Sequence, residues 1–405
     1  MKKKLATLVI TSAMSLLAAA CGTVPGKVQP AEIDVRTLDT GSYNTDPAEL
    51  RYDYTPNLTN GKQIAIMRLA DVIAPGPDID AKLDYGGAAP VLSPADATSI
   101  KFAENFVPVL TRHDMLYGMQ TANSDRSENG PVEGDTAVNI SVFQFPSDEA
   151  AAAAAQEFEA ADFDIAKDQN QPVALNKYPK ALSHWRPGIR TMGTRMARGS
   201  YVLSIFVRTP RSEVSDLAAL AERVYDAQLP LLDTLPPVSK RDLLHLPFDP
   251  FGIFRKTFHP NDLFGVGIPG EMWLSDRAYL HFVDDKKATR EIFRKTGVDA
   301  IGVVQNGISS DNNAAVAWRT RDFASATTLS DYLRGKSKRL VDSPPKMPDT
   351  FCSENVGFQP SSFTARNYNC TVRYDRFVGK VSSSQLLDAQ QRAAAQYALF
   401  ANSSW

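Results

Sequence analysis

The chain is short of several features that would each have pointed to a function. It has 3 Cys and 5 His in 405 residues, too few for a disulfide-held scaffold or a multi-cysteine zinc array. It also has no excess of positive charge, because 44 Lys and Arg face 46 Asp and Glu. Phosphate backbones are held by basic surfaces, so nucleic acid is not an expected partner. With 43% apolar residues, the chain is not disordered and can bury one large core or two ordinary ones.

Catalytic motifs are scarce as well. The sequence contains no Gly-x-Ser-x-Gly elbow, no His-Glu-x-x-His and no Gly-x-x-x-x-Gly-Lys phosphate loop. Asp78, Asp80 and Asp84 resemble the start of a calcium loop, but Leu83 and Ala89 stand where that loop needs Gly and Glu. We therefore expect no metal, no cofactor and no enzymatic activity. The alternative is an envelope hydrolase whose site is assembled from distant residues, with His113 and His184 as the side chains to test.

The start of the chain indicates export. Lys residues at positions 2–4 precede an uncharged stretch over 5–20 that ends in three Ala. This stretch is shorter than the roughly 20 apolar residues of a transmembrane helix and is typical of a signal peptide. Leu17-Ala18-Ala19-Ala20-Cys21 resembles a bacterial lipobox. We expect cleavage before Cys21 and lipidation of its thiol; the alternative is an ordinary secretory signal with a chance Cys near the cut.

A lipidated Cys21 would fix the location of the protein. Each buried CH₂ of an acyl chain contributes about 0.8 kcal/mol, so two or three chains hold firmly where one does not. We expect the protein on the extracytoplasmic face of the cell membrane, bound to the membrane through this anchor. An envelope lipid, glycan or protein is the expected further partner. Residues 21–275 carry 23 basic and 33 acidic residues, whereas residues 276–405 carry 18 and 13, so the two parts should attract each other.

Hydrophobic periodicity predicts alternating strands and helices. The expected strands are residues 115–119, 137–145, 199–208, 300–305, 314–321, 352–358 and 368–378. The expected helices are residues 59–73, 94–111, 148–161, 212–232 and 275–295, one that begins near 324, and 384–401. The order of elements recurs in the second half, and short connections between strands favour antiparallel sheets. The predicted fold is α+β, with two related domains that each pack helices on an antiparallel sheet.

Two pairs of short segments support an internal duplication. Residues 145–148 enter a helix in the first half as residues 323–326 do in the second, and residues 227–232 close the first half as residues 395–400 close the second. The alternative is that sheet-and-helix units resemble one another through patterning alone. We expect these parts in chain order: signal peptide 1–20, tether 21–31, first domain 32–245, interdomain segment 246–272 and second domain 273–405.

The interdomain segment is rich in Pro and Phe. A free linker would be polar, so Phe251, Phe254 and Phe258 are expected to be buried in the interface between the domains. The functional alternative is an aromatic-lined groove between the domains that carries an apolar, lipid-like ligand.

Two further clusters are candidates for structure or binding. Cys352 and Cys370 are expected to form a cross-strand disulfide in an exported protein, which contributes about 3 kcal/mol in the chain-entropy model. His184, Trp185 and Arg186 lie in the densest mix of aromatic and ionisable residues, 178–188. We expect a loop there, with Trp185 packed and Arg186 on a carboxylate, and recognition of a ligand as the alternative.

Several motifs together resemble a known group of proteins. The lipobox, the run over 30–39, Gly76-Pro77-Asp78-Ile79-Asp80, Ser183-His184-Trp185-Arg186-Pro187-Gly188 and Arg277-Ala278-Tyr279-Leu280-His281 are similar to a family of actinobacterial cell-envelope lipoproteins. These occur in genera such as Nocardia and Rhodococcus. The resemblance spans nearly the whole mature chain and implies an envelope lipoprotein with two related α+β domains. The family has no assigned activity, so the resemblance implies no catalytic residues.

Overall fold

The structure is a computed structural model that describes residues 33–46, 55–98, 104–127, 132–261, 267, 270–305, 313–355 and 367–403. The predicted signal peptide, Cys21 and the tether lie outside these residues. Val35–Trp405 forms one compact unit, and the predicted domain boundaries within it stay a prediction. Of the helices in the described ranges, none combines the length and the apolar character needed to cross a membrane.

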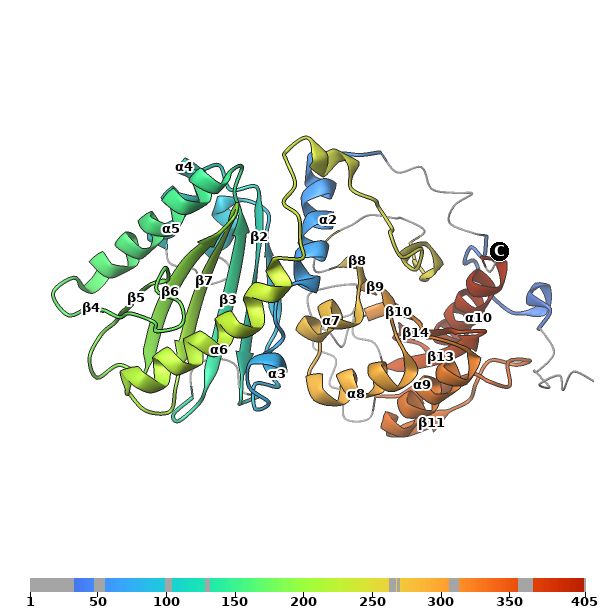
Figure 1. Cartoon of the computed structure of the whole chain (residues 1–405). Coiled ribbons are helices and arrows are strands. Elements are labelled where there is room, and N and C mark those ends of the chain that lie inside the picture. Colours follow the sequence, from blue (N-terminus) through green and yellow to red (C-terminus); the bar gives the residue numbers. More distant parts are fainter. Residues whose placement is uncertain are drawn as a thin grey trace, which may run out of the picture. The chain divides into compact units, whose positions relative to one another are not determined.

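The first half of the chain forms an antiparallel sheet. Among the described residues it has seven strands in the order β1-β2-β3-β7-β6-β5-β4 (Figure 1). The strands β1 to β7 are Ala88–Val91, Tyr117–Ser124, Ala137–Gln144, Gln171–Pro172, Leu182–Trp185, Thr191–Arg198 and Tyr201–Arg208. At the centre, Ile140 of β3 pairs with Ile205 of β7, and both side chains are buried. The alternation that predicted β3 and β7 therefore reflects packing of apolar side chains on the sheet.

The second half repeats this topology. Read from the β8 edge, its seven described strands lie in the order β8-β9-β10-β14-β13-β12-β11, which places each strand as its counterpart lies in the first sheet. The strands β8 to β14 are Glu271–Leu274, Ala300–Gln305, Asn313–Arg319, Arg339–Val341, Phe351–Glu354, Tyr368–Tyr374 and Phe377–Ser383. The predicted α+β fold with two related antiparallel sheets is confirmed, and we call the two halves the first and second repeat.

Helices cover both faces of each sheet. In the first repeat, Asp162 of α5 (Asp148–Phe163) contacts Arg195, whereas Tyr225 of α6 (Val214–Leu232) bonds to Thr194. Because successive strand residues point to opposite faces, α5 and α6 lie on opposite faces of the sheet. The helices α9 and α10 of the second repeat are Phe323–Lys336 and Leu386–Asn402. The other α-helices of the described ranges are α2, Leu58–Asp71; α3, Gly76–Ile79; α4, Val107–Arg112; α7, Asp276–Tyr279; and α8, Lys286–Thr296.

A buried glutamine occupies the same place in both repeats. In α6, Gln228 accepts a hydrogen bond from Ala74 N at 2.9 Å and donates one to Val72 O at 2.8 Å. In α10, Gln396 accepts from Phe258 N at 2.9 Å and donates to Lys256 O at 2.8 Å. Each side-chain amide thus bonds to two backbone groups that stand two residues apart, in the segment before the first strand of its sheet. This agrees with the predicted match of residues 227–232 with 395–400, which pairs Gln228 with Gln396.

The other predicted match between the repeats is out of register. Ser147 caps α5 by accepting a hydrogen bond from Ala150 N, and Asp322 caps α9 by accepting one from Ser325 N. Counted from these N-caps, Ser147 corresponds to Asp322 and not to Ser325. Because one polar N-cap residue can replace another, the alignment based on the short sequence likeness is shifted by three residues.

Several predicted elements are wrong in their extent. The helix expected over 94–111 contains two 3-10 helices, Pro94–Thr98 and Glu104–Phe106, before α4, and the strand expected over 115–119 is β2, which extends to Ser124. The strand expected over 368–378 is a hairpin, in which β13 and β14 are joined by Asp375 and Arg376. Asp375 has φ 47°, a left-handed conformation that Asp tolerates and that suits a two-residue turn. The helix expected over 275–295 is interrupted between α7 and α8, where the side chain of Asp285 caps α8 by accepting from Ala288 N. A side-chain cap at this position begins a new helix.

The aromatic segment packs on the second repeat. Phe254 and Phe258 are buried, and the Phe258 ring lies 4.9 Å from that of Tyr43. Phe251 is half-buried and lies edge-on to Trp273 of β8, with 5.4 Å between the ring centroids. These contacts place the three rings in the packing around β8 and α10. A ligand-binding role for the three Phe residues stays a prediction.

Candidate functional site

A groove lies on the first repeat where the end of α5 passes over β5, β6 and β7. Its volume is about 160 Å³. The groove is lined by Asp162, Ile165, Ala166, Asn170, His184, Trp185, Arg186, Ile189, Thr191, Gly193 and Phe206. The predicted candidates His184, Trp185 and Arg186 therefore share one surface feature with residues from α5, from η5 (Asp164–Ala166, a 3-10 helix) and from β6 and β7.

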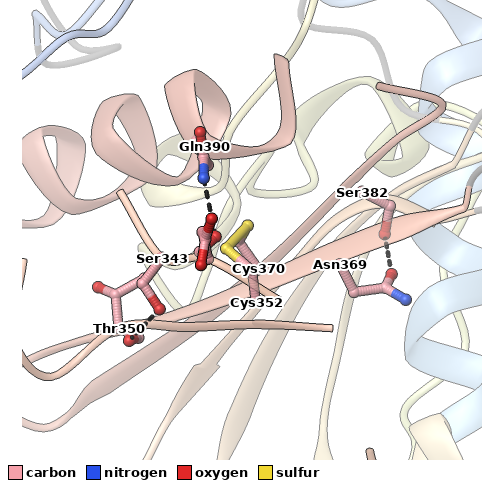
Figure 2. The surroundings of a disulfide bond; sticks show 8 residues. Ser343, Thr350, Cys352, Asn369, Cys370, Ser382 and Gln390 are labelled. Atoms are coloured by element: carbon pink, nitrogen blue, oxygen red, sulfur yellow. Dashed lines mark hydrogen bonds between the residues drawn. A yellow bond between two sulfur atoms is a disulfide. The ribbon is translucent and has the colours of Figure 1, made fainter. Parts of the chain in front are cut away.

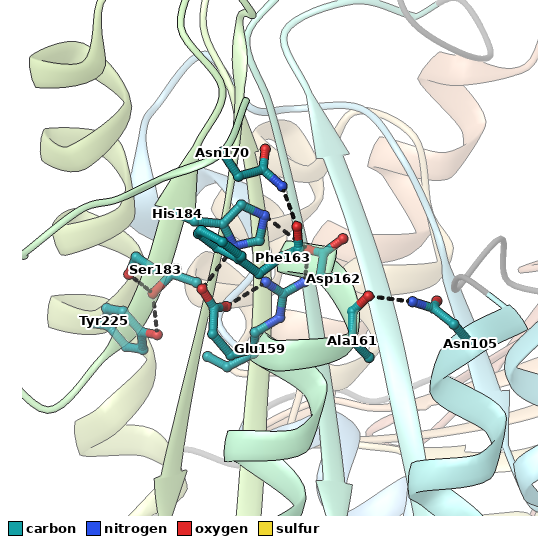
Figure 3. A network of polar contacts seen from close by, with 11 residues as sticks. Asn105, Glu159, Ala161, Asp162, Phe163, Asn170, Ser183, His184 and Tyr225 are labelled. Atoms are coloured by element: carbon teal, nitrogen blue, oxygen red, sulfur yellow. Dashed lines mark hydrogen bonds and ion pairs between the residues drawn. The ribbon is translucent and has the colours of Figure 1, made fainter. Parts of the chain in front are cut away.

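His184 is held by a carboxylate of α5. Its Nδ1 lies 2.8 Å from Glu159 Oε1, and its Nε2 lies 3.7 Å from Asp162 Oδ2. Figure 3 shows His184 between these two carboxyl groups. Burial raises the pKa of the Glu159 carboxyl, but the hydrogen bond from His184 and the charge of Arg195 outweigh burial and hold the pKa below its ordinary value. An ionised Glu159 accepts a hydrogen bond, so Nδ1 of His184 carries the proton.

Arg195 of β6 joins both carboxylates. Its Nη1 donates to Glu159 Oε2 at 2.9 Å, and its Nη2 pairs with Asp162 Oδ2. The side chain is only 4% exposed, and its guanidinium lies over the Phe106 ring at 5.5 Å. A buried guanidinium is tolerated because two carboxylates compensate its charge.

Gly193 makes room for this cluster. It lies on the same face of β6 as Arg195 and pairs across the sheet with His184. A Cβ at position 193 would lie 2.7 Å from Arg195 Nη1 and 3.1 Å from Asp162 Oδ2. The missing side chain at Gly193 thus leaves room for the Arg195 side chain to pass over this part of the sheet.

The rim of the groove is apolar. Ile165 is 65% exposed, Phe206 41% and Ile189 38%, which makes three of the large hydrophobic side chains that the described surface exposes. Trp185 is half-buried, and its indole N–H donates to Ile189 O at 2.7 Å, which holds the turn after β5. Exposed apolar side chains that gather around polar groups mark binding sites.

The second repeat does not carry the cluster. The hairpins β6–β7 and β13–β14 match residue for residue, so Thr194 corresponds to Cys370 and Arg195 to Thr371. Cross-strand pairing then matches His184 with Ser353. Counted from the N-caps, Glu159 corresponds to Arg334. The fold that both repeats share therefore does not require these charged residues, and they are specific to the first repeat.

The same correspondence places the disulfide. Cys352 of β12 and Cys370 of β13 are directly opposite each other, with 4.0 Å between their Cα atoms, and their sulfurs are bonded (Figure 2). Their counterparts in the first repeat are Ser183 and Thr194, whose hydroxyls share a buried hydrogen bond of 2.6 Å. The expected disulfide is present, and it replaces a hydrogen-bonded pair of the other repeat.

Sequence reasoning missed Glu159, Asp162, Gly193 and Arg195. Glu159 and Asp162 stand three residues apart on one side of a helix, which is a weak signal in an acidic half of the chain. The loop expected over 178–188 contains β5, so His184 and Trp185 belong to the sheet. Arg186 was expected on a carboxylate; within the described ranges no ion pair of Arg186 is found. The same ranges hold no group of His, Cys, Asp and Glu with the geometry to bind a metal ion.

A second pocket lies at the other end of the first sheet. It has a volume of about 370 Å³ and is lined partly by Tyr201, Pro236 and Pro237. Its Arg198 donates to both carboxylate oxygens of Asp233, at 2.7 and 2.6 Å. Because these charges satisfy each other, neither of them is available to a ligand in this pocket.

Comparisons with known proteins identify a family. The profile described as "Domain of unknown function (DUF7373) N-terminal" matches residues 52–248, and the C-terminal profile of the same name matches residues 271–403. No curated protein matches the sequence. Among solved structures, the extracellular domain of PknH from Mycobacterium tuberculosis is 12% identical, with a TM-score of 0.25, and the match covers 38% of this chain and 93% of that chain. Since the two profiles together span most of the sequence, the chain belongs to the DUF7373 family.

Proposed function

We propose that the protein is a lipid-anchored, extracytoplasmic binding module of the cell envelope, and that the groove of the first repeat is its binding site. The observation that carries the proposal is the groove itself, where a charged cluster specific to one repeat lies beneath an exposed apolar rim. A fold-supporting cluster would be expected in both repeats, because both have the same strand order.

The size of the groove suggests what it holds. Pockets that enclose a whole drug-sized ligand measure roughly 300–1,000 Å³, and this groove measures about 160 Å³. It therefore accepts one ring or one side chain of a larger molecule, and the exposed side chains of Ile165 and Phe206 contact the remainder. This arrangement suits a module that holds a macromolecule better than a carrier that encloses a lipid.

The anchor rests on the sequence, since Cys21 lies outside the described residues. Its test is metabolic labelling with an alkyne fatty acid in a bacterial host that processes lipoproteins. We expect the full-length protein to carry the label and to sediment with membranes, and the Cys21→Ser variant to lose both properties. The Cys352→Ser/Cys370→Ser double variant keeps Cys21 and should keep the label. An unlabelled wild-type protein in the cytosol would contradict the anchor.

A hydrolase is the second candidate, because Glu159 orients His184 through Nδ1 as a carboxylate orients a general base. The binding function is favoured because Nε2 of His184 faces the Asp162 carboxylate and not a nucleophilic hydroxyl. Profiling of the soluble domain with activity-based ester probes distinguishes the two. Labelling or turnover that disappears in a folded His184→Gln variant and persists in His113→Gln would establish the hydrolase.

A further inference from the structure

The polar groups left available in the groove are largely hydrogen-bond acceptors. Asn170 donates its side-chain N–H to Phe163 O at 2.8 Å, so its Oδ1 remains for a ligand. Asp162 bonds to Arg195 through Oδ2, and within the described ranges its Oδ1 has no hydrogen-bond partner. His184 uses Nδ1 for Glu159, and its Nε2 lies 3.7 Å from the Asp162 carboxylate. A ligand that fills the groove must donate hydrogen bonds.

The same groove also offers donors. Arg186 and Thr191 line it, and in the described part of the chain neither side chain has a hydrogen-bond or ion-pair partner. The ligand must therefore both donate and accept, as hydroxyl groups do.

The charges of the groove cancel. The carboxylates of Glu159 and Asp162 are tied to Arg195 in one network, and Arg186 adds a second guanidinium to the lining. A phosphate or another dianion would meet Asp162 as well as Arg186, so this site gives it no net attraction. An acyl chain would leave the acceptors at the floor unpaired, which costs roughly 1–3 kcal/mol for each buried group.

The common modes of peptide recognition do not fit the position. Strand addition needs an open sheet edge, and the outer edge of β5 is paired with β4, with Gln171 opposite Trp185. A helix needs an elongated apolar groove for side chains one and two turns apart, and a groove of about 160 Å³ is too small for that. A compact ring that carries several hydroxyls and has an apolar C–H face matches both the floor and the rim.

We propose that the groove binds one neutral sugar unit of a polysaccharide. Its hydroxyls donate to Asp162 Oδ1 and Asn170 Oδ1, and they accept from Arg186. Its C–H face lies against the apolar rim of Ile165 and Phe206. The inference rests on the proposed function, because it names the ligand class of the same groove.

The test uses the mature protein labelled with ¹³C at the Ile methyl groups, because Ile165 and Ile189 lie in the rim and report directly on the groove. The probes are methyl α-glucopyranoside, methyl α-mannopyranoside, methyl α-galactopyranoside, methyl α-arabinofuranoside and N-acetylglucosamine, titrated into the millimolar range. We expect at least one probe to shift both methyl signals with saturation. Methyl glucuronide, which adds a carboxylate, should bind no more tightly than the neutral glucoside.

Variants locate the binding. Arg186→Ala and Phe206→Ala should each raise the Kd about tenfold, the usual effect of losing a charged hydrogen bond or a stacking surface. Lys338→Ala and Leu340→Ala remove comparable exposed side chains of the second repeat and should leave the Kd unchanged. Equal losses in all four variants would contradict a site in the groove.

The remaining outcomes separate this inference from the proposed function. Octanoate and benzamide are titrated in parallel as apolar probes. If they shift Ile165 and Ile189 while no glycoside does, the sugar is wrong and the binding groove stands. Much tighter binding of methyl glucuronide would also overturn the neutral sugar, because it identifies an anion site. If no probe of any class shifts either signal, both proposals fail.

Discussion

Arg195 is the residue on which the charged cluster of the groove depends. It is 4% exposed and pairs with both Glu159 and Asp162. Its removal would leave two carboxylates close together without a compensating charge. We predict that Arg195→Met lowers the free energy of unfolding by about 3 kcal/mol, the lower end of the range for breaking a buried ion pair, because both carboxylates keep some contact with water.

Urea unfolding measures this loss. Arg198→Met is the matched control, because Arg198 pairs with Asp233 at the surface, where its side chain is 53% exposed, and such pairs contribute about 0–1 kcal/mol. A loss for Arg195→Met no larger than for Arg198→Met would show that Arg195 is not needed to compensate the two carboxylates.

His281 gives the protein a pH dependence of its own. Its Nε2 donates to Ala70 O at 3.1 Å and to Ile73 O at 3.2 Å, which ties the 3-10 turn that follows α7 to the end of α2. Burial, with the Lys286 charge nearby, lowers the pKa of His281 from 6.5 to about 4. Because the unfolded chain takes up this proton more readily, His281 contributes stability above pH 6.5, and this contribution falls away as the pH drops towards 4.

We predict that His281 accounts for a loss of about 3 kcal/mol of unfolding free energy as the pH falls from 6.5 to about 4. The measurement is urea unfolding across that range for the wild type and for His281→Gln, whose amide still donates a hydrogen bond but does not titrate. The wild type should lose more stability on acidification than the variant. Parallel curves would rule out His281 as the titrating group.

At the scale of elements, the helix caps give the simplest prediction. Ser147 accepts a hydrogen bond from Ala150 N at 3.2 Å, and α5, which it caps, carries Glu159 and Asp162 of the groove. We predict that Ser147→Ala lowers the free energy of unfolding by about 1 kcal/mol. Ser147→Asp should restore it, because an acidic cap also complements the helix dipole. Equal stabilities of Ser147→Ala and the wild type in urea unfolding would contradict a capping role.

The elements were predictable where one face packs on a core. Strands β3, β7 and β9 and helices α2, α5 and α10 lie close to their expected positions, because burial imposes a regular spacing of apolar residues. Elements whose bounds depend on a single turn were not predictable. The β13–β14 hairpin bends at Asp375, and no Gly or Pro marks that turn. By contrast, α6 ends at Leu232 as predicted, with Pro230 in its final turn.

The site was predictable only in part, and the reason is again physical. His184, Trp185 and Arg186 stand together in the sequence, so their composition attracts attention. Their partner Glu159 lies 25 residues away along the chain, in a helix half composed of Ala. Arg195 lies on the next strand of the sheet, β6. Tertiary pairing of this kind leaves no local pattern that a single sequence can reveal.

At the scale of the molecule, the two repeats join equivalent strands by different side-chain bonds. The Cys352–Cys370 disulfide occupies the position of the Ser183–Thr194 hydrogen bond. The disulfide closes a loop in the unfolded chain and so limits its conformational freedom. Without it, in the Cys352→Ser/Cys370→Ser variant, we predict a loss of about 3 kcal/mol of unfolding free energy. The check is urea unfolding of the oxidised wild type against this variant.

The correspondence also predicts that a disulfide can be built into the first repeat. Ser183→Cys/Thr194→Cys places two thiols on directly opposed residues of β5 and β6, and they should oxidise on export. Free-thiol titration under denaturing conditions measures the outcome. The neighbouring pair Leu182→Cys/Thr194→Cys, whose members point to opposite faces, should remain reduced. Free thiols in both variants would contradict the register that relates the repeats.

The proposed function requires that the first repeat, and not the second, carries the binding site in its groove. The measurement that tests it most directly is a crystallographic fragment screen of the mature protein with chemically diverse small molecules. We expect bound fragments to concentrate between Trp185, Ile165 and Phe206, with polar atoms at Asp162 and Asn170. Fragments that avoid this groove and gather on the second repeat would contradict it.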